Sequence, residues 1–169
     1  MSRECSAYLV DTNVIISAVI RGDVPRRCLE TCSTRYLVPE PVIEELLELL
    51  ATEDFQDIVD RIERKLSKRR ISVEELLARE IRLVATLLRS SIEYLDVKPD
   101  IGSLVRAEEV IGHRDPNDIP IVAIALHLAK TYRNEKICIW TDDRDILGEL
   151  PKKEQAVKAV PKPHCCKVS

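Results

Sequence analysis

Acidic residues follow two short apolar segments of this chain, at the point where each segment ends. Asp11 comes directly after residues 7–10, and Thr-Asp-Asp-Arg-Asp at residues 141–145 comes directly after residues 137–140. If both segments are parallel strands of one sheet, their carboxyl ends and the acids that follow them lie at the same edge. Hard cations such as Mg²⁺ prefer carboxylate oxygens, and clustered carboxylates repel one another without a cation. These acids are therefore candidate ligands of a divalent cation.

The same acids have a simpler structural interpretation, because each one precedes a predicted helix. Asp11 or Thr12 could cap the helix that follows the first segment. Asp142 or Asp143 could cap the helix that follows the later one. Capping alone remains open for each position, although the shared location of the two acidic sites favours a cation site.

A third acid, Asp118, lies at the start of another predicted helix. Pro120 is tolerated only in the first turn of a helix, so this helix begins near residues 116–118. A carboxylate in a first turn accepts hydrogen bonds from free amide groups and complements the helix dipole. Asp118 is therefore both a candidate ligand and a candidate cap.

The fourth acid is Glu44 or Glu45, in the helix predicted at residues 41–50. At about 100° per residue, Glu45 lies beside Val42 and Leu49 at the edge of the apolar stripe. Glu44 points further toward solvent. Glu45 is the better candidate ligand, although an acidic residue on a solvated helix face is the commoner occurrence.

The chain also carries the strands and helices needed to bring these acids together. Strands are predicted at residues 7–10, 36–38, 92–97 and 137–140, with a weaker one at 156–160. Helices are predicted between them at residues 12–20, 25–33, 41–50, 103–111 and 119–129. Strands that alternate with helices predict an α/β three-layer sandwich with a mostly parallel central sheet.

The longest interval between predicted strands, residues 54–91, predicts a helical hairpin inserted into this domain. Its two segments have helical periodicity, and Ser72 followed three residues later by Glu75 forms a capping box. No linker or repeat separates the hairpin from the rest. The 169 residues therefore predict a single domain over residues 1–160, with a loose tail at 161–169.

The formal net charge of −3 excludes a protein that coats nucleic acid through its overall charge, so a polyanion must meet a local basic patch. The densest basic run lies opposite an apolar helical stripe. Its candidate nucleic-acid contacts are Arg61, Arg64, Lys65 and Lys68. His113, which is next to Arg114, and late lysines such as Lys152 and Lys153 are sparser candidates. A solvated surface is the simpler interpretation of all these groups.

Neither the N-terminus nor the cysteines indicate secretion. The chain has no secretion signal and no apolar run near the ~20 residues of a membrane span, so we expect a cytoplasmic protein without membrane contact. Six cysteines match no zinc-binding spacing, and we expect them to be packing or tail residues without chemistry. They are Cys5, Cys28, Cys32, Cys138, Cys165 and Cys166.

Four motifs, in their order and spacing, resemble the PIN-domain family over residues 6–148. They are Val10-Asp11-Thr12-Asn13, Glu45-Leu46, Asp115-Pro116-Asn117-Asp118 and Trp140-Thr141-Asp142-Asp143-Arg144-Asp145. The resemblance implies a parallel sheet ordered 3-2-1-4-5, with the first and fourth strands adjacent at the switch point. It also implies an acidic quartet of catalytic metal ligands, namely Asp11, Glu45, Asp118 and Asp143. The supporting polar residues are Asn13, Asp115, Thr141 and Asp145.

The function that this resemblance implies is a metal-dependent endoribonuclease that uses Mg²⁺ or Mn²⁺. One or two ions would generate hydroxide from bound water and neutralise the charge that builds on the phosphate. In-line attack would leave a 5′-phosphate and a 3′-hydroxyl on single-stranded or structured RNA.

Several alternatives stay open at this point. The chain could be the toxin of a toxin-antitoxin pair, with a protein antitoxin as partner, or an RNA-processing enzyme within a complex, and it could form a homodimer. A nuclease-inactive RNA-binding scaffold is a different class, which the complete acidic quartet disfavours. A phosphoryl-transfer enzyme resembling haloacid dehalogenases needs a second Asp two residues after the first, where this chain has Asn13.

Overall fold

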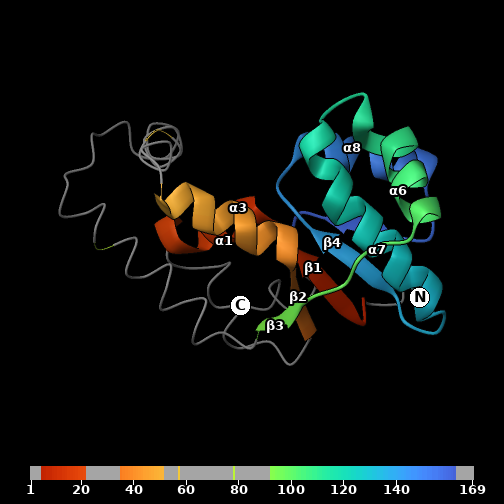
Figure 1. Ribbon diagram of the computed structural model, residues 1–169, viewed down its shortest axis with the longest axis horizontal. Coiled ribbons are helices and arrows are strands. Elements are labelled where there is room, and N and C mark those ends of the chain that lie inside the picture. Colours follow the sequence, from red (N-terminus) through yellow and green to blue (C-terminus); the bar gives the residue numbers. More distant parts are fainter. Residues whose placement is uncertain (1–4, 22–34, 52–56, 58–77, 79–91, 163–169) are drawn as a thin grey trace.

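The computed structural model describes residues 5–21, 35–51, 57, 78 and 92–162, and these residues form an α/β fold (Figure 1). Its strands are β1 (Ala7–Val10), β2 (Arg35–Pro39), β3 (Ile92–Leu95), β4 (Ile137–Trp140) and β5 (Lys158–Val160). Every predicted strand is therefore present. The two central strands have the bounds that the sequence predicted, whereas β3 ends two residues earlier and β5 begins two residues later.

All neighbouring strands are parallel, in the order β3-β2-β1-β4-β5, which confirms the predicted sheet. Ala7 lies beside Arg35 on one side and Ile137 on the other, and Val10 lies beside Trp140. The chain steps outward from β1 to β3 and then crosses back to β4. Strand order therefore reverses between β1 and β4, where the carboxyl ends of adjacent strands leave a crevice.

The central strands are anchored by apolar burial. Every residue of β1 and β4 is buried, as expected for strands covered on both faces. Tyr36 of β2 is fully buried, and its ring centroid lies 6.0 Å from that of Tyr8 and 5.7 Å from that of Trp140. These aromatic contacts join three adjacent strands and fix the positions of the residues that follow them.

Helices flank the sheet in two groups. They are α1 (Thr12–Arg21), α3 (Glu40–Ala51), α6 (Ile101–Ala107), α7 (Ile119–Thr131) and α8 (Arg144–Lys153). Figure 1 shows α1 and α3 together, and α6, α7 and α8 gathered around the β4 side. Because parallel crossovers are right-handed, helices of the outward steps and of the return steps cover opposite faces of the sheet. This arrangement gives three layers.

The helix predicted at residues 103–111 consists of two different elements. Helix α6 begins earlier than predicted because the Asp100 carboxylate accepts a hydrogen bond of 2.7 Å from the Ser103 amide and caps it. The chain then widens into a π-helical turn, η1 (Glu108–Gly112). A periodicity of 3.6 residues does not distinguish such a turn from continuing α-helix.

The expectation that all cysteines are packing or tail residues was wrong for two of them. Cys5, just before β1, and Cys138, in β4, form a disulfide with a Cα–Cα distance of 5.9 Å. They are 133 residues apart in sequence, and only the adjacency of β1 and β4 brings them together. The described part of the chain contains no free cysteine.

Several predicted features lie outside the described residues, and for these the sequence predictions stand as predictions. They are the helix at 25–33, nearly all of the hairpin at 54–91, Arg61, Arg64, Lys65, Lys68, Cys28, Cys32, Cys165 and Cys166. Within the described ranges, no helix combines the length and apolar character needed to cross a bilayer.

Candidate active site

A cleft of about 560 Å³ lies where the strand order reverses. It is lined by the residues after β1, the first turns of α3, the start of α7 and the residue that caps α8. All the ionisable groups among its described lining residues are carboxylates, namely Asp11, Glu44, Glu45, Glu48, Asp115, Asp118 and Asp143. The structure thus brings all four members of the predicted quartet into one cleft.

Asp11 is held rigidly at the end of β1. Its backbone N–H donates to the Trp140 carbonyl at 3.0 Å, which extends the pairing of β1 with β4. Its carboxylate accepts hydrogen bonds from the Thr12 amide at 2.8 Å and from the Thr141 hydroxyl at 2.6 Å. Burial raises the pKa of Asp11 from 3.8 to about 6, although both hydrogen bonds oppose this rise; the negative charges of Glu45 and Asp143 add to it.

Thr141 connects the acids that follow the two central strands. Its fully buried hydroxyl donates to Asp11 and accepts a hydrogen bond of 2.9 Å from the Asp143 amide. The side chain of Asp143 then caps α8, with Oδ1 accepting from the amides of Asp145 at 2.7 Å and Ile146 at 3.2 Å. The capping interpretation of Asp143 is therefore correct, but the cap uses only one of its oxygens. The other is left for the cleft.

Asp118 behaves differently from a helix cap. It stands immediately before α7, but its side chain makes no capping hydrogen bond. Asp115 instead caps the 3-10 turn η2 (Pro116–Asp118), accepting from the Asn117 amide at 2.9 Å. One oxygen of Asp118, Oδ2, is buried without a hydrogen-bond partner in the described structure.

The environment of Asp118 disfavours its ionised form. Burial raises its pKa from 3.8 to about 7, and the negative charges of Asp143, Asp11, Asp115 and Asp145 add to the rise. A buried polar atom without a hydrogen-bond partner costs free energy unless a water or an ion satisfies it. The Oδ2 atom of Asp118 is therefore a candidate ligand of a cation.

Glu45 is tied to the cleft by a hydrogen bond that the sequence did not reveal. The Thr12 hydroxyl, at the start of α1, donates to Glu45 Oε2 at 2.6 Å. Glu44 also lines the cleft, as does Glu48 one turn further along α3, which sequence reasoning missed. The spacing of Glu48 from Glu44 and Glu45 is the signal that could have identified it.

The predicted supporting residues take different places. Asn13 and Asp115 line the cleft directly. Thr141 does not line it, and acts through its hydrogen bonds to Asp11 and Asp143. Asp145 also stands outside the lining, and contributes charge that raises the pKa of Asp118.

The donor set of the cleft suits a hard divalent cation. As they stand, no three described His, Cys, Asp or Glu side chains have donor atoms placed to hold one ion together. Mg²⁺ and Mn²⁺ nevertheless need few protein ligands, because waters and substrate phosphate complete the shell. Asp11, Asp118, Asp143 and Glu45 could each offer an oxygen, and the unpartnered Oδ2 of Asp118 is the clearest of these. The residues present therefore fit such a cation.

Comparison with known proteins agrees with this architecture. A model of the PIN domain matches residues 9–157. Among solved structures, VapBC2 from Rickettsia felis, bound to a promoter DNA fragment, contains a chain similar in fold, with a TM-score of 0.50 and 15% identity, covering 91% of this chain and 97% of that one. No curated protein sequence matches significantly. Because the family model spans nearly the whole sequence, from β1 past α8, this chain belongs to the PIN-domain family, a family of nucleases.

Proposed function

We propose that this protein is a metal-dependent endoribonuclease that hydrolyses RNA phosphodiesters at its acidic cleft with Mg²⁺ or Mn²⁺. The observation that carries the proposal is the buried, unpartnered Oδ2 of Asp118 in a cleft where every ionisable lining residue that the structure describes is acidic. Such a site is costly to the fold without a cation. Membership of a nuclease family supplies the reaction class. The hydrolysis of a phosphodiester needs a cation to neutralise charge on the phosphate, and this cleft is suited to bind such a cation.

A cation held by Asp11, Glu45, Asp118 and Asp143 would activate a water molecule for attack and would neutralise charge that develops on the phosphate and the leaving oxygen. Neighbouring residues of the chain orient the carboxylates that would bind this cation. The Thr141 hydroxyl and the Thr12 amide fix both oxygens of Asp11, so the orientation of this carboxylate is set before a cation binds. The Thr12 hydroxyl fixes one oxygen of Glu45, so Thr12 contacts the carboxylates of both Asp11 and Glu45.

The raised pKa values of Asp11 and Asp118 have a consequence for cation binding. With pKa values of about 6 and about 7, both carboxyl groups carry bound protons over part of the mildly acidic range. Binding of a cation requires their ionised forms and displaces those protons. We therefore expect cleavage to weaken as the pH falls below about 7.

RNA is proposed as substrate on grounds of family and of surface chemistry. The chain has one Phe, one Trp and four Tyr residues, and Trp140 is buried in the sheet. Tyr94 and Tyr132 are the exposed aromatic residues of the described part, so few side chains there can stack on bases. Recognition then rests on phosphates and on the shape of the strand. Such recognition favours single-stranded or loosely structured RNA that can enter the cleft.

A second candidate role concerns the biological context of the same activity. The similar structure from Rickettsia felis contains a VapBC pair, which favours a toxin role with a protein antitoxin as partner for this chain. Expression of the chain in a bacterial host should then arrest growth unless a small protein encoded beside it is co-expressed. If growth is unaffected by an active enzyme, the RNA-processing role is favoured instead.

The nuclease proposal is tested by incubating the purified protein with a panel of labelled RNAs in Mg²⁺, in Mn²⁺ and in EDTA. We expect internal cleavage with either cation, none in EDTA, and products that carry a 5′-phosphate. The Asp143→Asn variant, prepared in the same way, controls for contaminating nucleases and should be inactive while it still binds RNA. Cleavage that persists in EDTA, or in the variant, contradicts the proposal.

A further inference from the structure

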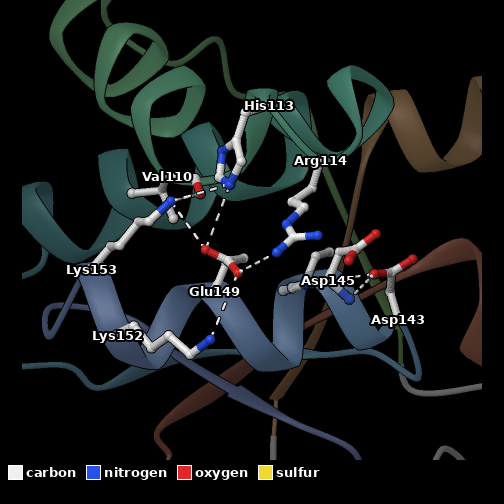
Figure 2. Close-up of polar contacts among 9 residues, drawn as sticks. Val110, His113, Arg114, Asp143, Asp145, Glu149, Lys152 and Lys153 are labelled. Carbon is white, nitrogen blue, oxygen red and sulfur yellow. Dashed lines mark hydrogen bonds and ion pairs between the residues drawn. The ribbon is translucent and has the colours of Figure 1, made fainter.

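A cationic cluster lies beside the acidic cleft, around one nearly buried carboxylate (Figure 2). Glu149 of α8 contacts Lys153 Nζ at 3.0 Å, Arg114 Nη2 at 3.4 Å, His113 Nε2 at 3.6 Å and Lys152 Nζ at 3.8 Å. The Glu149 side chain is 11% exposed, whereas those of Arg114 and Lys152 are 53% and 70% exposed. The carboxylate is therefore covered by cations that themselves face solvent.

The charges of this cluster do not balance. The hydrogen bond from Lys153, with the positive charges of Lys153, Lys152 and Arg114, holds the pKa of Glu149 below its ordinary value, so Glu149 remains ionised. One negative charge then faces three permanent positive charges, even when His113 is counted as neutral. Among the groups that contact Glu149, permanent positive charges therefore exceed the negative charge by two, before the neighbouring Asp143 and Asp145 are counted.

Other ion pairs in the described structure are matched more closely. Arg35 donates two hydrogen bonds of 3.0 Å to Glu93 and also lies 3.7 Å from Glu135. Lys130 pairs with Asp100 at 3.2 Å. Around Glu149, by contrast, a single carboxylate cannot satisfy the donors of three cations. The exposed N–H groups of Arg114 and Lys152 are available to a further anion.

The cluster is built on the same elements as the acidic cleft. Arg114 directly precedes Asp115, which lines the cleft, and α8 begins at the residue after Asp143. Figure 2 shows the Arg114 guanidinium between Glu149 and the pair Asp143 and Asp145. Lys152 follows Asp143 by nine residues of helix, a rise of roughly 14 Å. An RNA strand that leaves the cleft along α8 would therefore reach these cations.

We propose that Arg114 and Lys152, positioned by Glu149 beside the acidic cleft, bind backbone phosphates of the RNA strand that flank the scissile phosphate. The proposal rests on the proposed function and assigns it a substrate-binding surface. It follows from electrostatics, because the cleft and the net charge of −3 both repel a polyanion. A local surplus of positive charge next to the cleft offsets that repulsion and sets the path of the strand.

The test compares two double variants with the same loss of charge. Arg114→Gln with Lys152→Gln removes the proposed contacts. Arg35→Gln with Lys130→Gln removes an arginine and a lysine of similar exposure, 52% and 60%, that pair with Glu93 and Asp100. Arg35 is the first residue of β2, so it lies at the amino ends of the parallel strands, whereas the cleft lies at their carboxyl ends. Binding of a single-stranded RNA is measured in EDTA over a range of salt concentrations, so that no cleavage occurs.

Two lost phosphate contacts should flatten the slope of log affinity against log salt by about 1.4, at about 0.7 per contact. Between 50 and 200 mM salt, wild type should therefore lose about sevenfold more affinity than the Arg114 and Lys152 variant. The Arg35 and Lys130 variant should keep the wild-type slope. Equal slopes for both double variants, or no measurable binding by wild type, overturn the proposal.

A charge-preserving variant separates charge from loss of structure. Arg114→Lys with Lys152→Arg should retain most of the wild-type slope, and a loss as large as that of the glutamine variant overturns the proposal. Cleavage with Mn²⁺ is measured separately. If wild type cleaves RNA and the glutamine variant keeps the wild-type salt slope, only the proposed phosphate-binding surface is refuted. If the glutamine variant has a flatter slope but wild type does not cleave RNA, the surface is supported and the nuclease proposal is refuted.

Discussion

Each acid of the cleft has a distinct set of contacts, and these contacts decide what it can do. Sequence patterns placed Asp11, Asp118 and Asp143 at strand ends or helix starts, and the structure brings all three to one cleft. Capping alone accounts for one oxygen of Asp143, but Asp118 has no capping bond. The hydroxyl of Thr12 and the carboxylate of Glu48 were not foreseen, because their roles depend on how α1 and α3 pack.

The pKa of Asp118 gives a stability prediction with a definite sign. Its pKa in the folded protein, about 7, exceeds the 3.8 of the unfolded chain, so folding binds a proton in this range. The resulting stabilisation is complete below pH 3.8 and is lost as the pH rises through about 7. In EDTA, wild type should become less stable between pH 4.5 and pH 7.5, and Asp118→Asn should lose less stability over the same interval.

Urea unfolding at several pH values checks this expectation. The acids whose folded pKa is lowered, such as Asp100 and Glu93, act mainly below this interval and in the opposite direction. The difference between wild type and the variant therefore isolates Asp118. A variant that follows the wild-type curve in parallel would show that the pKa of Asp118 is not raised by folding.

Glu45 and Glu44 form a matched pair at the residue scale. Both are exposed carboxylates on the first turns of α3, and Glu45 accepts a hydrogen bond from the Thr12 hydroxyl. Glu45→Gln should lower the cleavage rate at limiting Mn²⁺ by roughly 10- to 100-fold, as losses of oriented ligand groups do. Glu44→Gln should have a smaller effect. A larger effect of Glu44→Gln than of Glu45→Gln would show that the face of α3 assigned to the cation is wrong.

At the scale of elements, the sequence predicted the strands better than the connections between them. Strands β1 and β4 are apolar runs bounded by polar residues, and both were predicted with the correct bounds. The π-helical turn η1 was not predicted, because the pattern of buried residues there is compatible with α-helix. The disulfide was also missed, since sequence alone does not show which strands are neighbours.

The disulfide gives a prediction about how β1 is held to β4. It closes a loop of 133 residues, and removing such a link should lower the free energy of unfolding by about 2–4 kcal/mol. Cys5→Ser is the informative change, because Cys138 is fully buried and a hydroxyl there would add a separate cost. Wild type should lose stability in dithiothreitol, whereas Cys5→Ser should not respond to it. An equal response of both proteins would show that the bond contributes nothing.

On the scale of the whole molecule, charge is divided between an acidic cleft and the cationic cluster around Glu149. Composition indicated only the small net charge of −3, which says nothing about this division. The division arises because the residues before Asp115 and the last turns of α8 meet beside the cleft. The basic run predicted from sequence at Arg61, Arg64, Lys65 and Lys68 lies outside the described residues and remains a separate prediction.

Cation binding should stabilise the whole fold, because it relieves repulsion in the cleft. Mn²⁺ at ten times its Kd should add about 1.4 kcal/mol, or roughly 3–5 °C in Tm for a domain of this size. Thermal unfolding with and without Mn²⁺ measures this shift. Asp118→Asn should reduce it strongly, and an undiminished shift in that variant would place the cation elsewhere.

The central claim, that the acidic cleft binds the cation with which RNA is cleaved, is tested most directly by one comparison. Cleavage of a single-stranded RNA is measured over a Mn²⁺ titration for wild type, Asp118→Asn and Asp142→Asn. Asp142 is an exposed aspartate next to Asp143 that does not line the cleft, so it provides the matched control. We predict that wild type and Asp142→Asn cleave at similar Mn²⁺ concentrations, whereas Asp118→Asn binds RNA but does not cleave it. Full cleavage by Asp118→Asn would contradict the claim.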